Sequence, residues 1–439
     1  MQKIYIQTFG CQMNLNDSEI IKSIMIGAGY EFVNNIEEAN VILLNTCSVR
    51  ENAVNNVHNK IGHIYSKIKH RNYKTVFGIL GCVAEHYGEK MLLYTNIVNL
   101  VVGPDEYRKL PELIKCCFEG ESKVAIDLNS KENYNDIIPV RNNNISAWIS
   151  IMRGCNNFCS YCVVPYVRGR ERSRSVDSIL REVDYLLAQD IKEITLLGQN
   201  VNSYFYDDIN FPKLLEAVAI AAPNVRIRFL TSHPKDMTSE LIDTIAKYDN
   251  ICNYIHLPVQ SGSNRILEKM NRKYTREHYL SLIREIREKL EEVTISTDII
   301  AGYPTETLED HQATLKLIKE VNFASAFMFY YSPREGTKAF EEVDDIPYDE
   351  KIRRLSEIIN TQSKISFEMN QRRAHKKRVL KDVLIEGSSK KRNNQLMGKT
   401  KTFHTVVFDN INNKYKTGDI VSVKINFATS KTLKGYIVE

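Results

Sequence analysis

The sequence predicts an α/β protein with three parts: an N-terminal open parallel α/β sheet, a central partial (β/α)6 barrel and a small C-terminal OB-like β-barrel. Three observations support this fold class. Residues 1–140 and 141–370 each alternate short apolar runs of strand character with segments of helical periodicity, which is typical of parallel sheets covered by helices. Residues 371–439 instead hold short strand-like runs between turn residues. At 439 residues, the chain is long enough for three such domains.

The N-terminal domain is expected to alternate strands and helices. The predicted strands are Ile4–Thr8, Val41–Asn45, Thr75–Leu80 and Ile97–Val102, and the predicted helices are Asp17–Gly27, Glu51–Lys69, Ala84–Leu93 and Glu106–Phe118. One cysteine follows each of the first three strands: Cys11, Cys47 and Cys82. The carboxyl ends of parallel strands share one edge of a sheet, so we expect these thiols to converge. One such cysteine alone would most often be a packing residue, but three at equivalent places indicate a joint site.

The central domain repeats a strand and a helix six times. Its predicted strands are Ala147–Met152, Glu193–Leu197, Val225–Leu230, Tyr254–Leu257, Thr294–Ile299 and Ala326–Tyr331. The helices between them are predicted at Val176–Gln189, Phe211–Ala221, Ser239–Lys247, Arg276–Leu290 and Leu308–Val321. This pattern predicts a partial barrel, open on one side, whose chemistry lies on the loops at the carboxyl ends of the strands.

Cys155, Cys159 and Cys162 follow the first of these strands with C-x3-C-x2-C spacing. Thiolates are the usual ligands of 4Fe-4S clusters, and three of them leave one iron open to a ligand that is not protein. A structural zinc site needs four ligands, and no second cysteine pair or nearby histidine follows. The spacing resembles that of the radical S-adenosylmethionine superfamily, whose members bind the amine and carboxylate of that cofactor at the open iron.

The remaining cysteines divide into two groups. Cys11, Cys47 and Cys82 are interpreted as ligands of a second, auxiliary 4Fe-4S cluster that also has one open iron. Cys116, Cys117 and Cys252 have no partner at a ligand-like spacing, and we expect them to be packing residues.

Polar residues gather on the loops that follow the barrel strands. Amide, hydroxyl, imidazole and carboxylate groups there are expected to hold the charged ends and the ribose of S-adenosylmethionine: Gln199, Asn200, His256, Gln260, Ser261 and Asp298. The glycine-containing loop 302–306 belongs to the same edge, although each such loop taken singly is a weak signal. Four arginines close behind the cysteine loop, Arg168, Arg170, Arg172 and Arg174, are expected either to contact phosphate or a cofactor carboxylate or to face solvent.

The C-terminal domain follows a charged helical stretch at Asp349–Arg373. Its predicted strands are Arg378–Glu386, Leu396–Lys399, Thr405–Asp409, Ile420–Asn426 and Leu433–Val438. Residues 371–439 carry 16 Lys and Arg against 5 Asp and Glu, an excess of +11, whereas the whole chain has a net charge of +5. An OB-like barrel with this charge indicates RNA binding, the alternative being a solvated charged surface. Base-stacking candidates are Phe403, His404, Phe408 and Tyr415, with Phe408 more typical of a core.

Composition excludes a membrane protein and a disulfide scaffold. No apolar run reaches the roughly 18 residues of a membrane helix, and the first residues lack the apolar segment of a signal peptide. We therefore expect a cytoplasmic protein whose nine cysteines serve metal binding or catalysis. A monomer is expected to suffice.

The order of these parts resembles the methylthiotransferase family over essentially the whole chain. Within that family, the runs 45–53 (NTCSVRENA), 150–155 (SIMRGC) and 162–169 (CVVPYVRG) are similar to the MiaB branch. No departure from the family pattern occurs at its six cysteines. The C-terminal part resembles the TRAM RNA-binding domain.

The resemblance implies an enzyme that converts N6-isopentenyl(dimethylallyl)adenosine beside the tRNA anticodon into its 2-methylthio derivative by radical chemistry. It implies that Cys155, Cys159 and Cys162 hold the S-adenosylmethionine cluster, and that Cys11, Cys47 and Cys82 hold the auxiliary cluster. The implied partners are the anticodon stem-loop of a tRNA and an electron donor such as flavodoxin or ferredoxin. Alternatives are methylthiolation of a ribosomal-protein aspartate or of threonylcarbamoyladenosine in tRNA, and a non-catalytic iron–sulfur protein that binds RNA or carries clusters.

Overall fold

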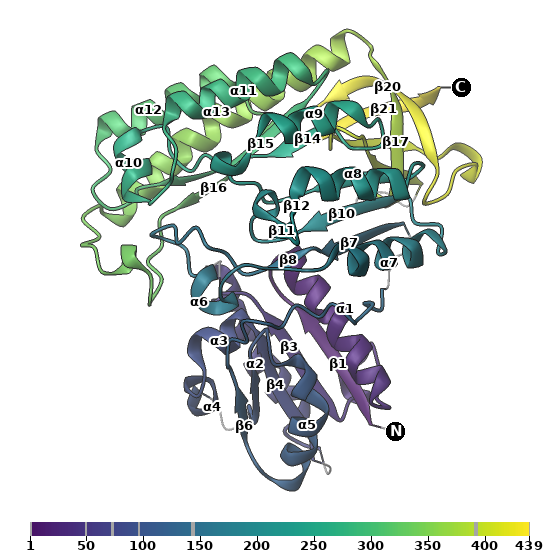
Figure 1. Ribbon diagram of the computed structural model, residues 1–439, viewed down its shortest axis with the longest axis vertical. Coiled ribbons are helices and arrows are strands. Elements are labelled where there is room, and N and C mark those ends of the chain that lie inside the picture. The colour runs from purple at the N-terminus through teal and green to yellow at the C-terminus, as the bar shows by residue number, and fades with distance from the viewer. Residues whose placement is uncertain are drawn as a thin grey trace.

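A computed structural model describes residues 2–48, 51–71, 74–94, 97–141, 145–389 and 394–438. Three parts lie in sequence order along it (Figure 1): the N-terminal sheet at the bottom, the central strands and their helices above it, and the small barrel at the upper right. This arrangement confirms the predicted fold class. Two residues of the 45–53 motif, Val49 and Arg50, lie outside the described residues.

The N-terminal part is a six-stranded, wholly parallel sheet in the order β2-β1-β3-β4-β5-β6. Its strands are β1 (Lys3–Thr8), β2 (Glu31–Phe32), β3 (Val41–Thr46), β4 (Val76–Gly81), β5 (Leu100–Val102) and β6 (Lys123–Ala125). The helices are α1 (Gln12–Gly27), α2 (Glu51–Ile68), α3 (Cys82–Tyr87), α4 (Lys90–Tyr94) and α5 (Leu110–Glu119). Residues of α1 and α5 pack on one face of the sheet and residues of α2, α3 and α4 on the other, so the sheet is doubly wound.

Differences from the predicted elements in this part have local causes. The predicted helix Ala84–Leu93 is two helices, because Gly88 has a φ of +50° between them. The edge strands β2 and β6 were not predicted, since runs of two and three residues have no measurable alternation. Helix α1 begins at Gln12, directly after Cys11, five residues before the predicted start at Asp17.

The central part contains two three-stranded parallel sheets, β7-β10-β13 and β14-β15-β16. Their strands are β7 (Ser146–Ser150), β10 (Glu193–Leu197), β13 (Arg226–Phe229), β14 (Tyr254–His256), β15 (Thr294–Ala301) and β16 (Ser325–Tyr330). A parallel bridge between Ile227 of β13 and Ile251, just before β14, joins the two sheets. The six strands therefore follow one another in chain order, as in an open partial barrel.

Helices cover the outside of these strands and share one large apolar core with them. They are α7 (Val176–Leu187), α8 (Phe211–Ala221), α9 (Ser239–Lys247), α11 (Arg276–Lys289) and α12 (Leu308–Val321). Three short pieces were not predicted: α6 (Val164–Arg168), α10 (Asn264–Lys269) and the hairpin of β11 (Phe205–Tyr206) and β12 (Ile209–Asn210). The predicted strand Ala147–Met152 is divided between β7 and β8 (Met152–Arg153), and β8 pairs with β9 (Arg172–Ser173).

The C-terminal part is a closed barrel in the order β17-β18-β19-β21-β20, as predicted. Its strands are β17 (Val379–Ser388), β18 (Gln395–Lys399), β19 (Thr405–Asp409), β20 (Ile420–Ala428) and β21 (Leu433–Val438). Helix α13 (Tyr348–His375) leads into it without a break, across the predicted division at residue 370. The predicted domain ranges 1–140, 141–370 and 371–439 stay predictions. None of the helices in the described part of the chain is long and apolar enough to cross a membrane.

Two buried arginines of β13 hold the barrel against the central sheet. Arg226 Nη1 donates to the carbonyl of Lys399 at 3.0 Å, and Arg228 donates to the carbonyls of Thr400 and Lys401 at 2.7 Å each. The Arg228 Nε also lies 2.9 Å from the buried Glu193 carboxylate of β10. One side chain thus satisfies two carbonyls and one carboxylate at this contact.

We expect Arg228→Ala to lower the midpoint of thermal unfolding by several degrees. The substitution leaves the buried Glu193 carboxylate uncompensated, and breaking a buried pair costs about 3–5 kcal/mol. Lys247→Ala is the matched control, because Lys247 pairs with Glu216 at 2.7 Å on the exposed surface and such pairs contribute about 0–1 kcal/mol. Equal shifts for the two variants in differential scanning fluorimetry would contradict this role for Arg228.

Candidate active site

The three N-terminal cysteines lie together at the carboxyl edge of the sheet. Cys11 follows β1 and Cys47 follows β3, and these neighbouring strands flank the point where the strand order reverses, which is where open α/β sheets bind ligands. A hydrogen bond with the Cys47 side chain, together with the charge of Arg168, outweighs burial and lowers the pKa of Cys11 to about 6. Cys82, the first residue of α3 after β4, is close enough for the charge of Cys11 to affect its pKa. The predicted convergence of these three residues is therefore observed.

Two glycines make this close approach possible. Gly10 has a φ of +124°, and a Cβ atom there would lie 2.4 Å from the Cβ of Cys47. Gly81 has a φ of +85°, and a Cβ atom there would lie 2.6 Å from the carbonyl oxygen of Thr46. Any side chain at either position would push neighbouring cysteine loops apart.

The second cysteine set lies on the loop between β8 and α6. Burial raises the pKa of Cys155 to about 11 and also raises the pKa of Cys162. Arg272 Nη1 donates to Cys159 Sγ at 3.3 Å, and its Nη2 donates to the carbonyl of Pro258 at 2.8 Å. A buried guanidinium therefore faces the middle cysteine of this set.

Helix α6 connects the two cysteine sets. It begins two residues after Cys162, and Val163 and Val167 pack against Cys82. Its last residue, Arg168, donates through Nε to Cys82 Sγ at 3.3 Å and through Nη2 to Asp17 Oδ2 at 2.7 Å. Thiol groups that are 80 residues apart in sequence thus lie on either side of one short helix.

Buried ion pairs surround this helix. Asp17 of α1 is fully buried and also accepts from Arg153 Nη1 at 2.8 Å, while Asp105 accepts from Arg172 Nη2 at 2.9 Å. Burial opposes ionisation of Asp17, but the two guanidinium groups beside it outweigh burial, and the pKa of its carboxyl is lowered. For Asp105, burial outweighs its arginine neighbours and raises the pKa.

The expectation for the four arginines behind the cysteine loop was therefore wrong for three of them. Arg168 and Arg172 are buried in the ion pairs just described, and Arg174 is buried against Glu182 at 2.7 Å. Arg170 alone is exposed, with its guanidinium 4.7 Å from the ring of Phe158. The sequence could not show this for Arg168 and Arg172, because their carboxylate partners Asp17 and Asp105 belong to the N-terminal part of the chain.

The residues predicted to bind S-adenosylmethionine are distributed over two places. His256, Gln260 and Asp298 lie together. His256 Nε2 is 3.4 Å from Asp298 Oδ1, and the backbone N–H of Gln260 donates to the backbone carbonyl of Asp298 at 2.9 Å. Ser261 is fully buried, with its Oγ 3.4 Å from that of Thr314 on α12. Its hydroxyl therefore takes part in helix packing.

Gln199 and Asn200 lie at the carboxyl end of β10. Asn200 donates to Asp236 at 2.6 Å. Within the described part of the chain, the buried Gln199 Oε1, the Asn200 Oδ1 and both amide atoms of Asn202 have no hydrogen-bond partner. Buried polar atoms of this kind are costly unless a ligand or water satisfies them, so their presence fits a polar cofactor here. Asn202 was not among the predicted contacts.

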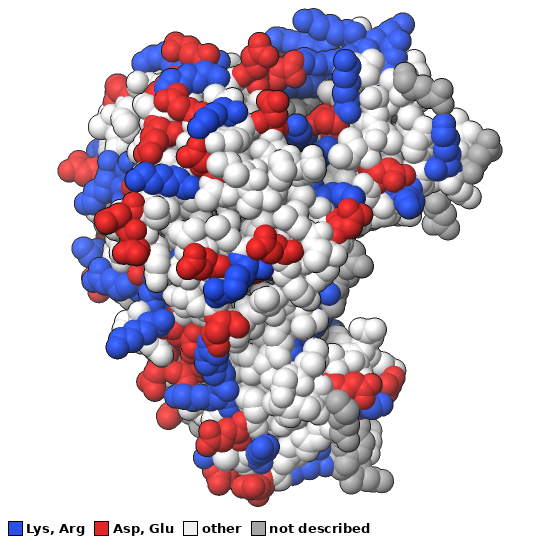
Figure 2. Space-filling model, turned by 45° about the vertical axis from the view of Figure 1, so that its right-hand side comes forward, with Lys and Arg blue, Asp and Glu red and all other residues white. Residues whose placement is uncertain are grey.

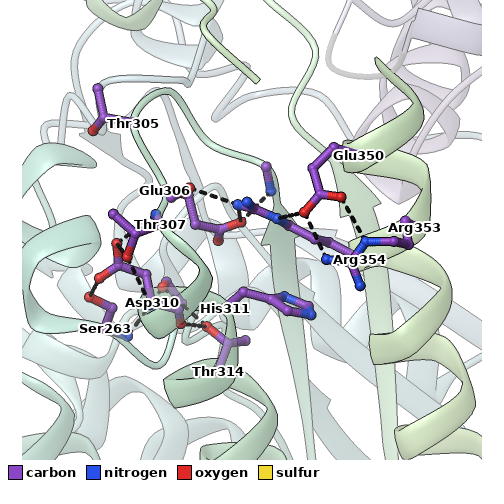
Figure 3. Close-up of polar contacts among 12 residues, drawn as sticks. Ser263, Thr305, Glu306, Thr307, Asp310, His311, Thr314, Glu350, Arg353 and Arg354 are labelled. Atoms are coloured by element: carbon purple, nitrogen blue, oxygen red, sulfur yellow. Dashed lines mark hydrogen bonds and ion pairs between the residues drawn. The ribbon is translucent and has the colours of Figure 1, made fainter. Parts of the chain in front are cut away.

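Loop 302–306 is held by a separate polar network (Figure 3). Glu306 accepts from the Gly302 amide at 2.8 Å and from Arg354 of α13 at 2.9 Å. In α12, Asp310 accepts from Ser263 at 2.5 Å and pairs with Arg265; these contacts outweigh burial and lower the pKa of Asp310 to about 2. The network fixes this loop between α12 and α13.

The aromatic candidates for base stacking are covered. Phe408 lies in the barrel core, and Phe403 stacks on Tyr254 of β14 with ring centroids 4.5 Å apart. Burial, together with Arg373 and Arg378, lowers the pKa of His404 to about 3, and Tyr415 is half-buried. These side chains stabilise the barrel and its contact with the central part instead of presenting free faces.

Positive charge gathers where α13 meets the barrel. Arg372, Lys376, Lys377 and Lys381 are exposed there. Figure 2 shows Lys and Arg side chains crowded along the top of the molecule. The charge of this surface suits a polyanion.

No group of three or more His, Cys, Asp or Glu side chains among the described residues is arranged for a single metal ion. A cubane cluster binds each thiolate at a different iron, so its ligands stand further apart than the ligands of one ion. Two sets of three thiols, each beside a guanidinium donor, fit clusters better than single ions.

Comparison with known proteins agrees with this geometry. Residues 149–318 match the Radical SAM superfamily, residues 3–103 match the uncharacterized protein family UPF0004, and residues 378–438 match the TRAM domain. The solved structure of the radical S-adenosylmethionine methyltransferase TsrM from Kitasatospora setae has a TM-score of 0.60 with this chain, at 16% identity and 77% coverage of both. The cobalamin-dependent S-adenosylmethionine radical enzyme OxsB has a TM-score of 0.56, at 13% identity, covering 82% of this chain and 56% of that one. These two likenesses establish the fold alone.

The fold and the cysteine loop define a radical S-adenosylmethionine enzyme, a class that uses S-adenosylmethionine and a 4Fe-4S cluster. Close relatives identify the family within this class. The tRNA-2-methylthio-N(6)-dimethylallyladenosine synthase of Bacteroides thetaiotaomicron is 49% identical over 99% of this chain and 96% of its own length. The proteins of that name from Azobacteroides pseudotrichonymphae and Porphyromonas gingivalis are 51% and 47% identical, over 99% and 100% of this chain and 97% and 95% of theirs. The chain belongs to the tRNA-2-methylthio-N(6)-dimethylallyladenosine synthase family, which confirms the resemblance seen in its motifs.

We expect Gly10→Ala to destabilise the protein by about 1–3 kcal/mol, because a strained backbone conformation costs this much and the added methyl group would collide with Cys47. The substitution should also reduce the iron bound after anaerobic reconstitution. Gly29→Ala is the control: its φ is +85°, but nothing lies within 4 Å of the added Cβ. If both variants lost iron equally, the collision with Cys47 would not be the cause.

Proposed function

We propose that this protein attaches a methylthio group to carbon 2 of N6-isopentenyl(dimethylallyl)adenosine beside the anticodon of tRNA, using S-adenosylmethionine and two 4Fe-4S clusters. The observation that carries the proposal is the juxtaposition of two separate sets of three cysteines across α6. One set would serve the radical step and the other the sulfur transfer, so an enzyme with both needs them close together.

Each set has a distinct assignment. Cys155, Cys159 and Cys162 would hold the S-adenosylmethionine cluster, and Cys11, Cys47 and Cys82 would hold the auxiliary cluster. When bound, these groups supply radical and sulfur-transfer chemistry, which the substrate requires because carbon 2 of an adenine is neither acidic nor electrophilic enough for side-chain acid–base chemistry. We further propose the domain division 1–140, 141–370 and 371–439.

The protein's own side chains would bind and orient these groups. The unpartnered amide oxygens of Gln199 and Asn200 suit the amino end of the cofactor, and the unpartnered Asn202 Nδ2 suits its carboxylate. The linked His256 and Asp298 suit its ribose hydroxyls. Gln260 and Ser261 would act through their backbone, because the Gln260 backbone N–H binds the Asp298 carbonyl of β15 and the Ser261 hydroxyl faces α12. Cys155 and Cys159 are each 8% exposed, so bulk water has little access to these two thiols.

The RNA would be held by charge and shape. The exposed lysines and arginines at the end of α13 and on the barrel suit the phosphates of an anticodon stem-loop. An adenosine in a loop is cheaper to unstack than a paired one, so it can reach the central part. We propose that the protein acts as a monomer in the cytoplasm, with a one-electron donor such as flavodoxin or ferredoxin.

The test is nucleoside analysis after anaerobic reaction. Reconstituted protein is incubated with prenylated tRNA, reductant and S-adenosylmethionine, and the digested nucleosides are read by mass spectrometry. We expect 2-methylthio-N6-isopentenyladenosine from the intact protein and none from Cys159→Ala or Cys47→Ala. Cys47→Ala should still form 5′-deoxyadenosine and retain ~4 iron atoms per chain, whereas Cys159→Ala should retain iron without cleaving the cofactor.

Other outcomes would favour other functions. Cofactor cleavage without change to this tRNA would direct the search to threonylcarbamoyladenosine tRNA or a ribosomal-protein aspartate. If fully loaded protein cleaved no cofactor, the enzymatic proposal would fail and a non-catalytic iron–sulfur protein would be the better description.

Binding of the anticodon stem-loop should weaken steeply with salt. Neutralising Lys376 and Lys377 to Gln should reduce the slope of log affinity against log salt by about 1–2, since each phosphate contact contributes roughly 0.7–0.9. Lys115→Gln, an exposed lysine on α5 of the N-terminal sheet, is the control and should leave the slope unchanged. Fluorescence anisotropy at several salt concentrations measures it, and an unchanged slope in the double variant would place the RNA elsewhere.

A further inference from the structure

The buried ion pairs beside the N-terminal cysteines are not balanced in charge. Three guanidinium groups, those of Arg153, Arg168 and Arg172, meet two carboxylates, those of Asp17 and Asp105, and none of the five residues is more than 8% exposed. Two other carboxyl groups lie nearby. The buried Glu106 lies against Lys109 at 2.6 Å, and burial together with the charges of Asp105, Asp127 and Glu106 raises the pKa of Glu85 to about 8, so neither supplies the missing charge. A buried charge without a counter-charge is costly. The network therefore has room for one further negative group.

Arg168 is the arginine of this positively charged network that contacts a cysteine of the N-terminal set. Its Nη2 serves Asp17 at 2.7 Å and its Nε donates to Cys82 Sγ at 3.3 Å. Its third nitrogen, Nη1, is buried and has no acceptor among the described residues. Asp17 is shared with Arg153, so it cannot neutralise Arg168 alone. Within the described ranges, the other acceptor that this guanidinium contacts is the Cys82 sulfur.

We infer that Arg168 is a positioning residue that compensates the negative charge of the Cys11, Cys47 and Cys82 sulfur atoms and thereby raises the reduction potential of the cluster that they would hold. The inference rests on the auxiliary-cluster assignment made under the proposed function. A donor to a ligand sulfur stabilises the more negative, reduced cluster, and such hydrogen bonds and local charge are known determinants of cluster potential. The free Nη1 would donate to a sulfur atom of the same cluster.

Arg272 provides a matched comparison in the other set. It donates to Cys159 Sγ at the same 3.3 Å, and among the described residues it also donates to the Pro258 carbonyl and the Tyr274 hydroxyl, both uncharged. Each cysteine set thus has its own buried guanidinium donor. Arg168 contacts the N-terminal cysteine set and also pairs with the Asp17 carboxylate, whereas Arg272 contacts the central set. Each arginine can therefore be substituted without removing the other's contact to sulfur.

The test measures cluster potentials in the full-length, reconstituted protein by redox titration followed by electron paramagnetic resonance. The auxiliary cluster is read in a Cys155→Ala/Cys159→Ala/Cys162→Ala background, and the other cluster in a Cys11→Ala/Cys47→Ala/Cys82→Ala background. Arg168→Gln should shift the auxiliary potential to a more negative value. It leaves two guanidinium groups with two carboxylates, so the network should still fold.

Asp17→Asn separates charge compensation from a structural role. Both Arg168→Gln and Asp17→Asn remove the same ion pair, so a purely structural role predicts the same change for both. Charge compensation predicts opposite signs, because Asp17→Asn leaves Arg168 fully available to the sulfur atoms and should raise the potential. Arg272→Gln should leave the auxiliary potential unchanged and lower that of the Cys155, Cys159 and Cys162 cluster.

Shifts of the same sign in the two auxiliary variants, or no shift in either, would overturn the inference. If Arg168→Gln binds no auxiliary iron, Arg168→Lys decides: restored loading supports charge compensation, and continued loss overturns it. Loss of an outer contact to a cluster ligand is expected to weaken retention of the auxiliary iron against a chelator by about 10- to 100-fold. If the unsubstituted Cys11, Cys47 and Cys82 set binds no cluster, it is the proposed function that fails, and this is seen before any Arg168 variant is made.

Discussion

The burial of Asp17 between Arg153 and Arg168 is the interaction on which the rest of the site depends. Asp17 belongs to α1 of the N-terminal sheet, and the two arginines flank the cysteine loop of the central part. Removing these charges from water is costly, and the cost is offset only because the carboxylate lies within hydrogen-bond distance of both guanidinium groups. The lowered pKa of Asp17 shows that the attraction outweighs burial. This contact fixes the position of one cysteine set relative to the other.

The two cysteine sets are electrostatically different although they have the same number of thiols. A hydrogen bond with Cys47 and the charge of Arg168 lower the pKa of Cys11 to about 6, whereas burial raises the pKa of Cys155 to about 11. A cluster binds thiolates, so its assembly on the central set must release protons from buried thiols. Within the N-terminal set the thiols also differ, because burial raises the pKa of Cys82 while that of Cys11 is lowered. The surroundings of each thiol, and not its residue type, therefore produce the difference in pKa between Cys11 and Cys155.

The contacts of the small barrel explain how an RNA-binding part would keep a fixed position. Arg226 and Arg228 bind its backbone carbonyls, Phe403 stacks on Tyr254, and α13 is tied to loop 302–306 through Arg354 and Glu306 (Figure 3). Of the aromatic residues predicted to stack on bases, Phe403 packs at this contact and Phe408 lies in the barrel core. The exposed lysine and arginine side chains at the end of α13 would be available to contact the phosphates of the RNA.

The sequence by itself determined the fold class, most of the strands and helices, and the two cysteine sets. Strand and helix periodicity is local, so α8, α9, α12, β10, β19 and β21 match their predicted bounds. The convergence of Cys11, Cys47 and Cys82 also followed, because the ends of parallel strands must share one edge of a sheet. The recurrence of a cysteine after successive strands was the signal.

Only the tertiary structure decided what the charged and aromatic side chains do. Arg168 and Asp17 are 151 positions apart in the chain, and Arg228 and Thr400 are 172 positions apart. A polar or aromatic side chain has the same local pattern whether it faces solvent, a ligand or a distant partner. Its role depends on which group lies opposite after folding, because the desolvation cost of a buried charge is offset only by a well-placed partner.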